Sequence, residues 1–256
     1  MSPTSSRHWD AVVMLVAAFG VGLSAADVGE PHQGPIVQYG TMHEAIAQQQ
    51  HEGRVSFGEV VKRPHFYGVA ALEGLRGEAT ILDGKVTMTT VDVDGRMQPI
   101  EGPASDKQAT LLVGAYVSSW SKHAVSQDVG AGEFDSYIAD AAGKAGMRTS
   151  EPFLFTIEGE FTDVRLHVIN GACPMHARLK DVELPKEQQP FASVVPRVKG
   201  TLVGVFAKDA VGKLTHPATS THDHLLFEDP ATGKTATGHV ERVGLRAGSV
   251  VRFPQS

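Results

Sequence analysis

Short runs of β-branched and aromatic residues, separated by turn residues, are the feature that most restricts the fold of this chain. The segment EATILDGKVTMTTVD, residues 78–92, predicts a hairpin that turns at Asp83 and Gly84, because such a pair fits a tight turn between strands. Further strands are expected over residues 65–74, 109–120, 153–161, 163–169 and 200–207, and in a histidine-containing segment after them.

Helical segments are few. Residues 42–50 contain helix formers with an apolar stripe, Ser56 can cap a short helix that Pro64 would stop, and residues 133–147 form a third candidate. The pattern therefore predicts a strand-rich α+β chain. We expect an N-terminal α+β part over residues 27–148 and a C-terminal β-rich part over residues 149–256.

The first 26 residues differ from the rest of the chain. Arg7 precedes an apolar run over residues 11–23, and small residues follow at 24–26. A transmembrane helix needs about 20 apolar residues, whereas a run of this length is typical of a signal peptide. We expect residues 1–26 to be a signal peptide and the protein to be secreted or periplasmic, with no stable membrane span. An uncleaved anchor and a buried helix are the alternatives.

Charge and cysteine content exclude several classes of function. The formal net charge is −6, and no block of five or more Lys and Arg residues occurs, so the chain lacks the basic surface that nucleic-acid binding requires. A small-molecule partner is the better expectation. The single cysteine, Cys173, excludes an internal disulfide and is most simply a buried apolar residue, although nearby His176 leaves a thiol nucleophile or metal ligand open.

Three histidines gather in the segment TSTHDHLLFEDPATGKTATGHV, residues 219–240. His222 and His224 are two residues apart, so on a strand they share a face. A turn centred between residues 231 and 232 places His224 opposite His239, close enough for all three imidazoles to bind one cation with open coordination positions, as in catalytic sites. A shift of one residue would turn His239 away, and exposed polar histidines are the alternative. His216 is expected in a loop, either at an entrance or solvated.

Several motifs together resemble the acetolactate decarboxylase family. They span about residues 37–245, nearly all of the chain after the expected signal peptide: YGTMHEAIA, LRGEATILDGK, PFLFTIEGEFTDVR, VKGTLVGVF, HDHLLFED and GHV. The resemblance implies two intimately packed β-rich parts, a homodimer, and Zn²⁺ held by His222, His224 and His239. It also implies conversion of 2-acetolactate, or a related small 2-hydroxy-3-oxo acid, to acetoin and CO₂.

The resemblance further assigns active-site residues, with two departures. Glu78, in LRGE, matches a family carboxylate and is the candidate for proton handling or for holding a metal-bound oxygen. Where the family has an arginine that grips the substrate carboxylate, this chain has VRLH, so Arg165 or His167 would have to act in its place. The family's C-terminal glutamate has no match, because no Glu follows Glu241.

Two other functions remain open from the sequence. HDHLLFE also fits a cupin metal site, in which Glu228 would be an additional ligand on the face of His222 and His224. Loss of the arginine and the terminal glutamate favours a non-catalytic member of the same fold that binds a small acid or a metal.

Overall fold

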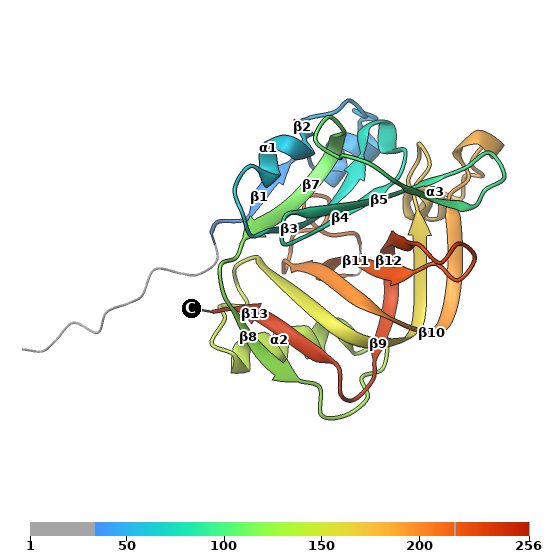
Figure 1. Ribbon diagram of the computed structural model, residues 1–256. Coiled ribbons are helices and arrows are strands. Elements are labelled where there is room, and N and C mark those ends of the chain that lie inside the picture. Colours follow the sequence, from blue (N-terminus) through green and yellow to red (C-terminus); the bar gives the residue numbers. More distant parts are fainter. Residues whose placement is uncertain (1–33, 218, 256) are drawn as a thin grey trace, which may run out of the picture.

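Two antiparallel sheets pack against each other in the computed structural model, which describes residues 34–217 and 219–255 (Figure 1). The expected strand-rich fold with few helices is confirmed. The expected signal peptide, residues 1–26, lies outside the described residues. Among the residues described, no helix combines the length and hydrophobicity needed to cross a membrane.

The first sheet comes from the N-terminal part of the chain and has the order β1-β7-β3-β4-β5-β6, with β2 beside β7. The predicted hairpin is confirmed: β4 and β5 pair from Glu78 to Leu82, and Asp83 and Gly84 both have positive φ, as a tight twisted turn requires. The strands are β1 (Val37–Tyr39), β2 (Val55–Ser56), β3 (Phe66–Leu72), β4 (Glu78–Leu82), β5 (Lys85–Val91), β6 (Met97–Ile100) and β7 (Gln108–Tyr116).

The second sheet contains a closed ring of four strands. β9 pairs with β10, β10 with β11, β11 with β12, and β12 returns to β9, while β13 and β8 extend the sheet beyond β9. The strands are β8 (Trp120–Ala124), β9 (Phe153–Val168), β10 (Phe191–Phe206), β11 (Thr221–Glu228), β12 (Thr235–Leu245) and β13 (Val250–Pro254).

The sequence underestimated how long the strands of this ring are. The segments expected over 153–161 and 163–169 form one strand, β9, in which Asp163 has a φ of 49° where pairing with β12 shifts register. Such an irregularity bends a strand without ending it. β10 likewise begins at Phe191, well before the expected residue 200. The first sheet ends with β7 and the second begins with β8, while the division of the chain into two parts at residue 148 stays a prediction.

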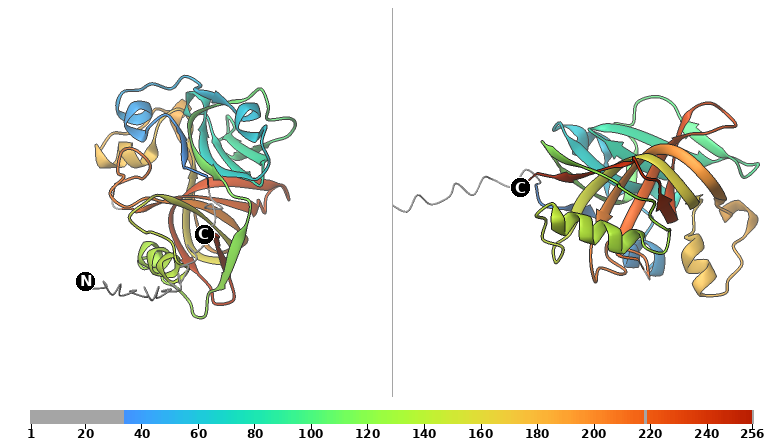
Figure 2. Two further views of the ribbon diagram at one scale, coloured as in Figure 1. Left: turned by 90° about the vertical axis from the view of Figure 1, so that its left-hand side faces the viewer. Right: turned by 90° about the horizontal axis from the view of Figure 1, so that it is seen from below.

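Helices lie at the margins of the sheets (Figures 1 and 2). Helix α2 (Phe134–Lys144) confirms the prediction over 133–147 and buries Phe134, Ile138 and Ala142 against the second sheet's core, at the spacing of one helix face. The predicted cap is also present, since Ser56 accepts a hydrogen bond from the Glu59 N–H at the start of α1 (Phe57–Val61). The remaining helices are the π-helix η1 (His43–Ala47), α3 (Pro174–Leu179), and the 3₁₀ turns η2 (Glu73–Leu75) and η3 (Lys186–Gln188).

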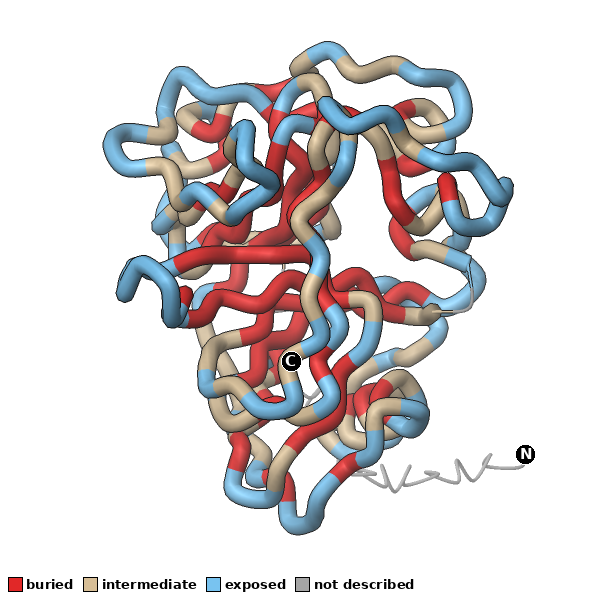
Figure 3. The backbone as a smooth tube through the Cα atoms, turned by 90° about the vertical axis from the view of Figure 1, so that its right-hand side faces the viewer, coloured by how far each residue is buried: buried red, intermediate tan, exposed pale blue. Residues whose placement is uncertain are grey.

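The sheets meet where β4 and β5 face β11 and β12, and the backbone there is buried (Figure 3). Thr237 of β12 joins the layers: its hydroxyl lies 2.5 Å from the Thr80 hydroxyl, and its N–H donates to Thr89 Oγ1 over 2.8 Å. β11 is therefore covered on both faces, with every residue buried from Thr221 to Phe227. Polar side chains in this strand are held inside the protein, where an unpartnered polar group is costly.

Candidate metal centre

The β11–β12 hairpin brings the three predicted histidines together. The predicted register is confirmed, since His224 pairs directly with His239, and His222 precedes on the same face. All three side chains are buried, and a ring nitrogen from each lies within 4.8 Å of those of the other two. The ring centroids are 5.1 to 5.5 Å apart, so the imidazoles converge on one point.

Backbone carbonyls fix the orientation of two of these rings. His222 Nδ1 lies 3.0 Å from the Leu214 carbonyl oxygen, and His224 Nδ1 lies 3.0 Å from that of Ala79 in the first sheet. Because a carbonyl oxygen can only accept, each Nδ1 carries the proton and each Nε2 keeps a free lone pair. Metal-binding histidines characteristically have their second nitrogen fixed in this way.

Burial also keeps the three rings neutral, which metal binding requires. It lowers the pKa of His224 to about 3 and those of His222 and His239 well below the usual value, with neighbouring histidines adding to the effect on His222 and His239. Three neutral nitrogen donors with fixed rings fit a divalent transition metal and leave further coordination positions open.

Glu78 reaches this cluster from β4, at the start of the first sheet's hairpin. Its side chain is buried, with Oε2 3.6 Å from His224 Nε2 and Oε1 accepting a hydrogen bond from the Ile169 N–H over 3.2 Å. Burial raises the pKa of this carboxyl well above its usual range. The structure therefore places an acid beside the three histidines, as the motif predicted, while its role in proton handling stays a prediction.

Of the two candidates from the VRLH motif, only His167 enters the cluster. It lies opposite His239, with ring centroids 4.9 Å apart, and its Nε2 is 4.0 Å from Glu78 Oε1. Arg165 shares that strand face, but its side chain is exposed. Within the described part of the chain, no hydrogen bond or ion pair connects Arg165 to the histidines, and its role in binding the substrate stays a prediction.

Sequence reasoning missed two neighbours of the cluster. The His216 ring lies 4.9 Å from that of His239, and burial, with a further contribution from His167, lowers its pKa to about 4. His216 lies in a loop, where no periodic pattern in the sequence predicts the direction of its side chain. Glu241 lies two residues after His239 on the same strand face, and this spacing could have predicted that it neighbours the cluster.

Two hollows that share His216 and His239 in their linings border the cluster. One, of about 30 Å³, is lined by Glu78, His167, Cys173 and the histidines at 216, 222 and 239, and burial raises the pKa of the Cys173 thiol. The other, of about 270 Å³, is polar and shares His216 and His239 with the first. Together they provide an inner chamber, which we call the cavity, and an outer approach.

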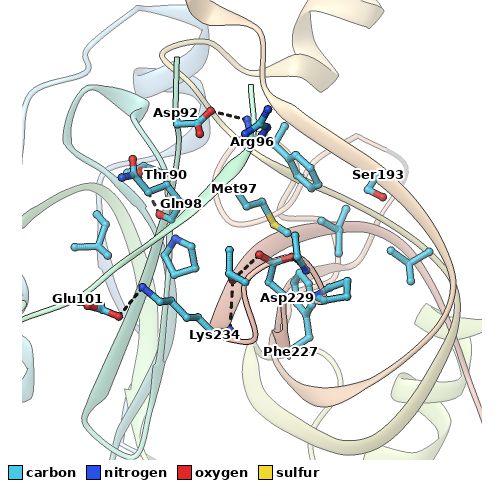
Figure 4. Close-up of a pocket in the computed structure, with 18 residues that line it drawn as sticks. Thr90, Asp92, Arg96, Met97, Gln98, Glu101, Ser193, Phe227, Asp229 and Lys234 are labelled. Atoms are coloured by element: carbon cyan, nitrogen blue, oxygen red, sulfur yellow. Dashed lines mark hydrogen bonds and ion pairs between the residues drawn. The ribbon is translucent and has the colours of Figure 1, made fainter. Parts of the chain in front are cut away.

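A wider pocket of about 830 Å³ lies elsewhere, between β6 and the β10–β12 region (Figure 4). Met97, Phe191 and Phe227 line it, and Lys234 reaches Glu101 across 2.8 Å at its rim. Its lining contains none of the site histidines, so its size does not make it the centre of the chemistry. Glu228 is also remote: it is exposed at the end of β11, about 13 Å along the strand from His224, which rules out the predicted cupin ligand set.

Comparisons with known proteins agree with this geometry. A family model described as alpha-acetolactate decarboxylase matches residues 36–253. A search of curated proteins finds no match.

Three of the solved structures that match show the same fold. The alpha-acetolactate decarboxylase of Bacillus subtilis strain 168 is 18% identical, with a TM-score of 0.61 over 87% of this chain and 86% of that one. The enzyme of Bacillus subtilis subspecies spizizenii is 19% identical, with a TM-score of 0.63 and 87% coverage of both chains. A protein of unknown function from Staphylococcus aureus, similar to alpha-acetolactate decarboxylase, is 18% identical, with a TM-score of 0.56 over 87% and 85%. Since the family model covers most of the sequence, the chain belongs to the alpha-acetolactate decarboxylase family.

Proposed function

We propose that this chain catalyses the zinc-dependent decarboxylation of 2-acetolactate, or of a related small 2-hydroxy-3-oxo acid, to acetoin and CO₂. The observation that carries the proposal is the convergence of His222, His224 and His239 beside a buried Glu78. Family membership supports the reaction class, and three imidazole ligands with open positions suit Zn²⁺.

The metal ligands come from the second sheet, whereas Glu78 comes from the first. When bound to the three histidines, Zn²⁺ supplies a fixed positive charge where negative charge develops on the ketone oxygen during loss of CO₂. His222 and His224 are held for this task by the carbonyls of Leu214 and Ala79. The small cavity limits the water that can reach the reacting carbon.

Glu78 is suited to deliver the proton that replaces CO₂. Burial raises the pKa of its carboxyl well above the usual range, which favours the protonated form, and the Ile169 N–H fixes the direction of Oε1. His167, across the cavity, is placed to hydrogen-bond a polar group of the substrate. A positioned acid of this kind contributes roughly 100-fold or more to a proton transfer.

The test combines metal analysis with an assay for acetoin and CO₂. The full chain should contain one zinc per molecule and form both products from racemic acetolactate, and a chelator should abolish this activity. His224→Ala should lose the metal and at least about 100-fold of the rate. His43→Ala is the matched control, because His43 is exposed and lies in η1. Zinc-loaded protein that forms neither product would remove the named reaction.

One observation favours a second function, that of a non-catalytic member that binds a small acid. The exposed position of Arg165 leaves the VRLH motif without a guanidinium directed at the cavity. This alternative predicts that the zinc-loaded chain binds acetolactate, measured by calorimetry, without releasing CO₂.

A further inference from the structure

A chain of polar contacts runs from the surface to the cavity behind His167. Arg178 of α3 donates to Glu241 Oε2 of β12 over 2.5 Å, and Glu241 Oε1 lies 2.8 Å from His167 Nδ1 of β9. The three residues come from separate elements. Glu241 and His167 are almost fully buried, whereas Arg178 is half exposed, so the guanidinium connects a buried pair to solvent.

The Glu241 carboxylate can only accept hydrogen bonds. Arg178 has only donors and stays charged, so its contact with Oε2 fits an ionised carboxylate. An ionised carboxylate has no proton to donate, so His167 Nδ1 must carry one. In the neutral ring the remaining nitrogen, Nε2, then has a free lone pair.

We propose that Glu241, which Arg178 binds from the surface side, is a positioning residue that holds His167 in its Nδ1–H form, so that Nε2 faces the cavity as an acceptor for a hydroxyl group of the ligand. Nε2 lies 4.0 Å from Glu78 Oε1, within the same small cavity as the metal-binding histidines. The identity of the ligand rests on the proposed function. The positioning of His167 does not, because it follows from contacts within the protein.

This arrangement changes what the VRLH position can recognise. A guanidinium offers only donors and so selects a carboxylate. An unprotonated imidazole nitrogen is an acceptor, and its lone pair would be repelled by the lone pairs of a carboxylate oxygen. A hydroxyl fits instead, because it can donate. The chain is therefore specific for acids that carry a hydroxyl beside the carboxylate, as 2-hydroxy-3-oxo acids do.

The variant Glu241→Gln tests the positioning without changing the size of the side chain. Arg178 has only donors, so it will attract the amide oxygen of the new glutamine. The amide NH₂ then faces His167 Nδ1, which must become the acceptor, and the proton moves to Nε2. Arg178→Met is the complementary variant: it leaves the Glu241 carboxylate in place, so the Nδ1–H form should persist.

The ring-nitrogen ¹⁵N shifts of His167 distinguish the two forms, because protonated and bare nitrogens give well-separated signals. They are measured in the metal-free full chain and assigned by loss of the signal in His167→Gln. We expect Nδ1–H in the native protein and in Arg178→Met, and Nε2–H in Glu241→Gln. Glu158→Gln is the matched control, since Glu158 binds Arg252 in a similar pair on the surface. An Nε2–H native ring, or an unchanged ring in Glu241→Gln, would overturn the positioning.

The hydroxyl preference is measured separately, by calorimetry on zinc-loaded protein with 2-hydroxy-2-methylpropanoate and 2-methylpropanoate. The native chain should bind the hydroxy acid at least about tenfold more tightly than 2-methylpropanoate. In Glu241→Gln the ratio of the two dissociation constants should be about tenfold smaller. An unchanged ratio would contradict the ligand assignment. Both measurements stand even if acetolactate is not turned over, so failure of the proposed reaction and failure of this inference are distinguishable.

Discussion

Buried polar residues of β11 determine what the site can do. His222 and His224 alternate with Asp223, and all three are enclosed because the strand lies between two packed layers. The histidines face the cluster while Asp223 points to the other side, where Thr221 is its partner. Burial favours the neutral form of both types of group, because it disfavours charge on an imidazole and on a carboxyl alike.

Asp223 should be replaceable by its neutral amide. Thr221 Oγ1 lies 2.6 Å from Asp223 Oδ2 and 3.0 Å from Asp135 Oδ1, and one hydroxyl proton cannot serve two carboxylates. Burial raises the pKa of Asp223 well above its usual range, and Asp135 adds to this, so Asp223 carries the extra proton. Asp223→Asn should therefore change the free energy of unfolding at pH 7 by less than about 1 kcal/mol, measured in urea. A loss of about 3 kcal/mol or more would show that a charged Asp223 is required.

At the scale of single residues, the sequence was informative only where the spacing along a strand predicts the direction of a side chain. His222, His224 and His239 could be predicted because strand alternation and a turn place them. His216 could not, since its loop has no repeat from which a side-chain direction follows. Its closeness to His239 depends on how that loop folds over the β11–β12 hairpin.

The β11–β12 hairpin is the element on which the metal centre depends. Its turn sets the register, and the register alone decides whether His239 faces His224 or the opposite side. Thr237, two pairs away from His239, ties the same hairpin to the first sheet. A change of register would therefore disturb both the ligands and the contact between the layers.

A one-residue insertion tests this dependence. A glycine inserted after Gly233, in the exposed turn, should leave the zinc content at one per chain, because Gly233 has open space around it. The same glycine inserted between Thr237 and Gly238 should turn His239 to the other face and abolish zinc binding. Zinc content is measured by mass spectrometry, with circular dichroism to follow folding. Full zinc content in the second variant would show that the register does not control the site.

Local signals explain which elements could be predicted. The β4–β5 turn, the Ser56 cap and the apolar face of α2 all lie within a few residues of the element they define. The lengths of β9 and β10 have no such local signal, because each strand is extended by pairing with a partner strand far along the chain. The bend at Asp163 was mistaken for an end, since a bulge and a turn look alike in sequence.

The whole molecule is organised around polar groups enclosed between two sheets. The first sheet supplies Glu78 and the carbonyl of Ala79, and the second supplies the histidines. β8 and α2 precede residue 148 in the chain, yet β8 belongs to the second sheet and α2 packs against its core. Enclosing so many titratable groups makes the stability of the fold depend on pH.

We expect metal-free protein to lose stability as pH falls below about 6.5. Burial lowers the pKa of the enclosed histidines in the folded state, so they stay neutral there but gain protons when unfolded, which favours unfolding. Each of these histidines lowers the free energy of unfolding by about 1.4 kcal/mol for every pH unit below its pKa in the unfolded chain. Glu78 and Asp223 act in the opposite sense, because their raised pKa values let the folded state bind protons that the unfolded state releases, but they are fewer.

Urea unfolding at pH 7.5 and pH 5.5 measures this effect. The midpoint should be lower at pH 5.5 than at pH 7.5 in metal-free protein, and zinc should raise it at pH 7.5 because only the folded state assembles the three ligands. An equal midpoint at both pH values would mean that the histidines are not held neutral inside the fold.

The most direct test of the central claim is an X-ray absorption spectrum of the zinc-loaded full chain. The structure predicts one zinc per chain with three imidazole nitrogens at about 2.0 to 2.1 Å, and loss of this signal in His224→Ala. Fewer than three imidazoles, or a sulfur at about 2.3 Å from nearby Cys173, would contradict a centre built by His222, His224 and His239.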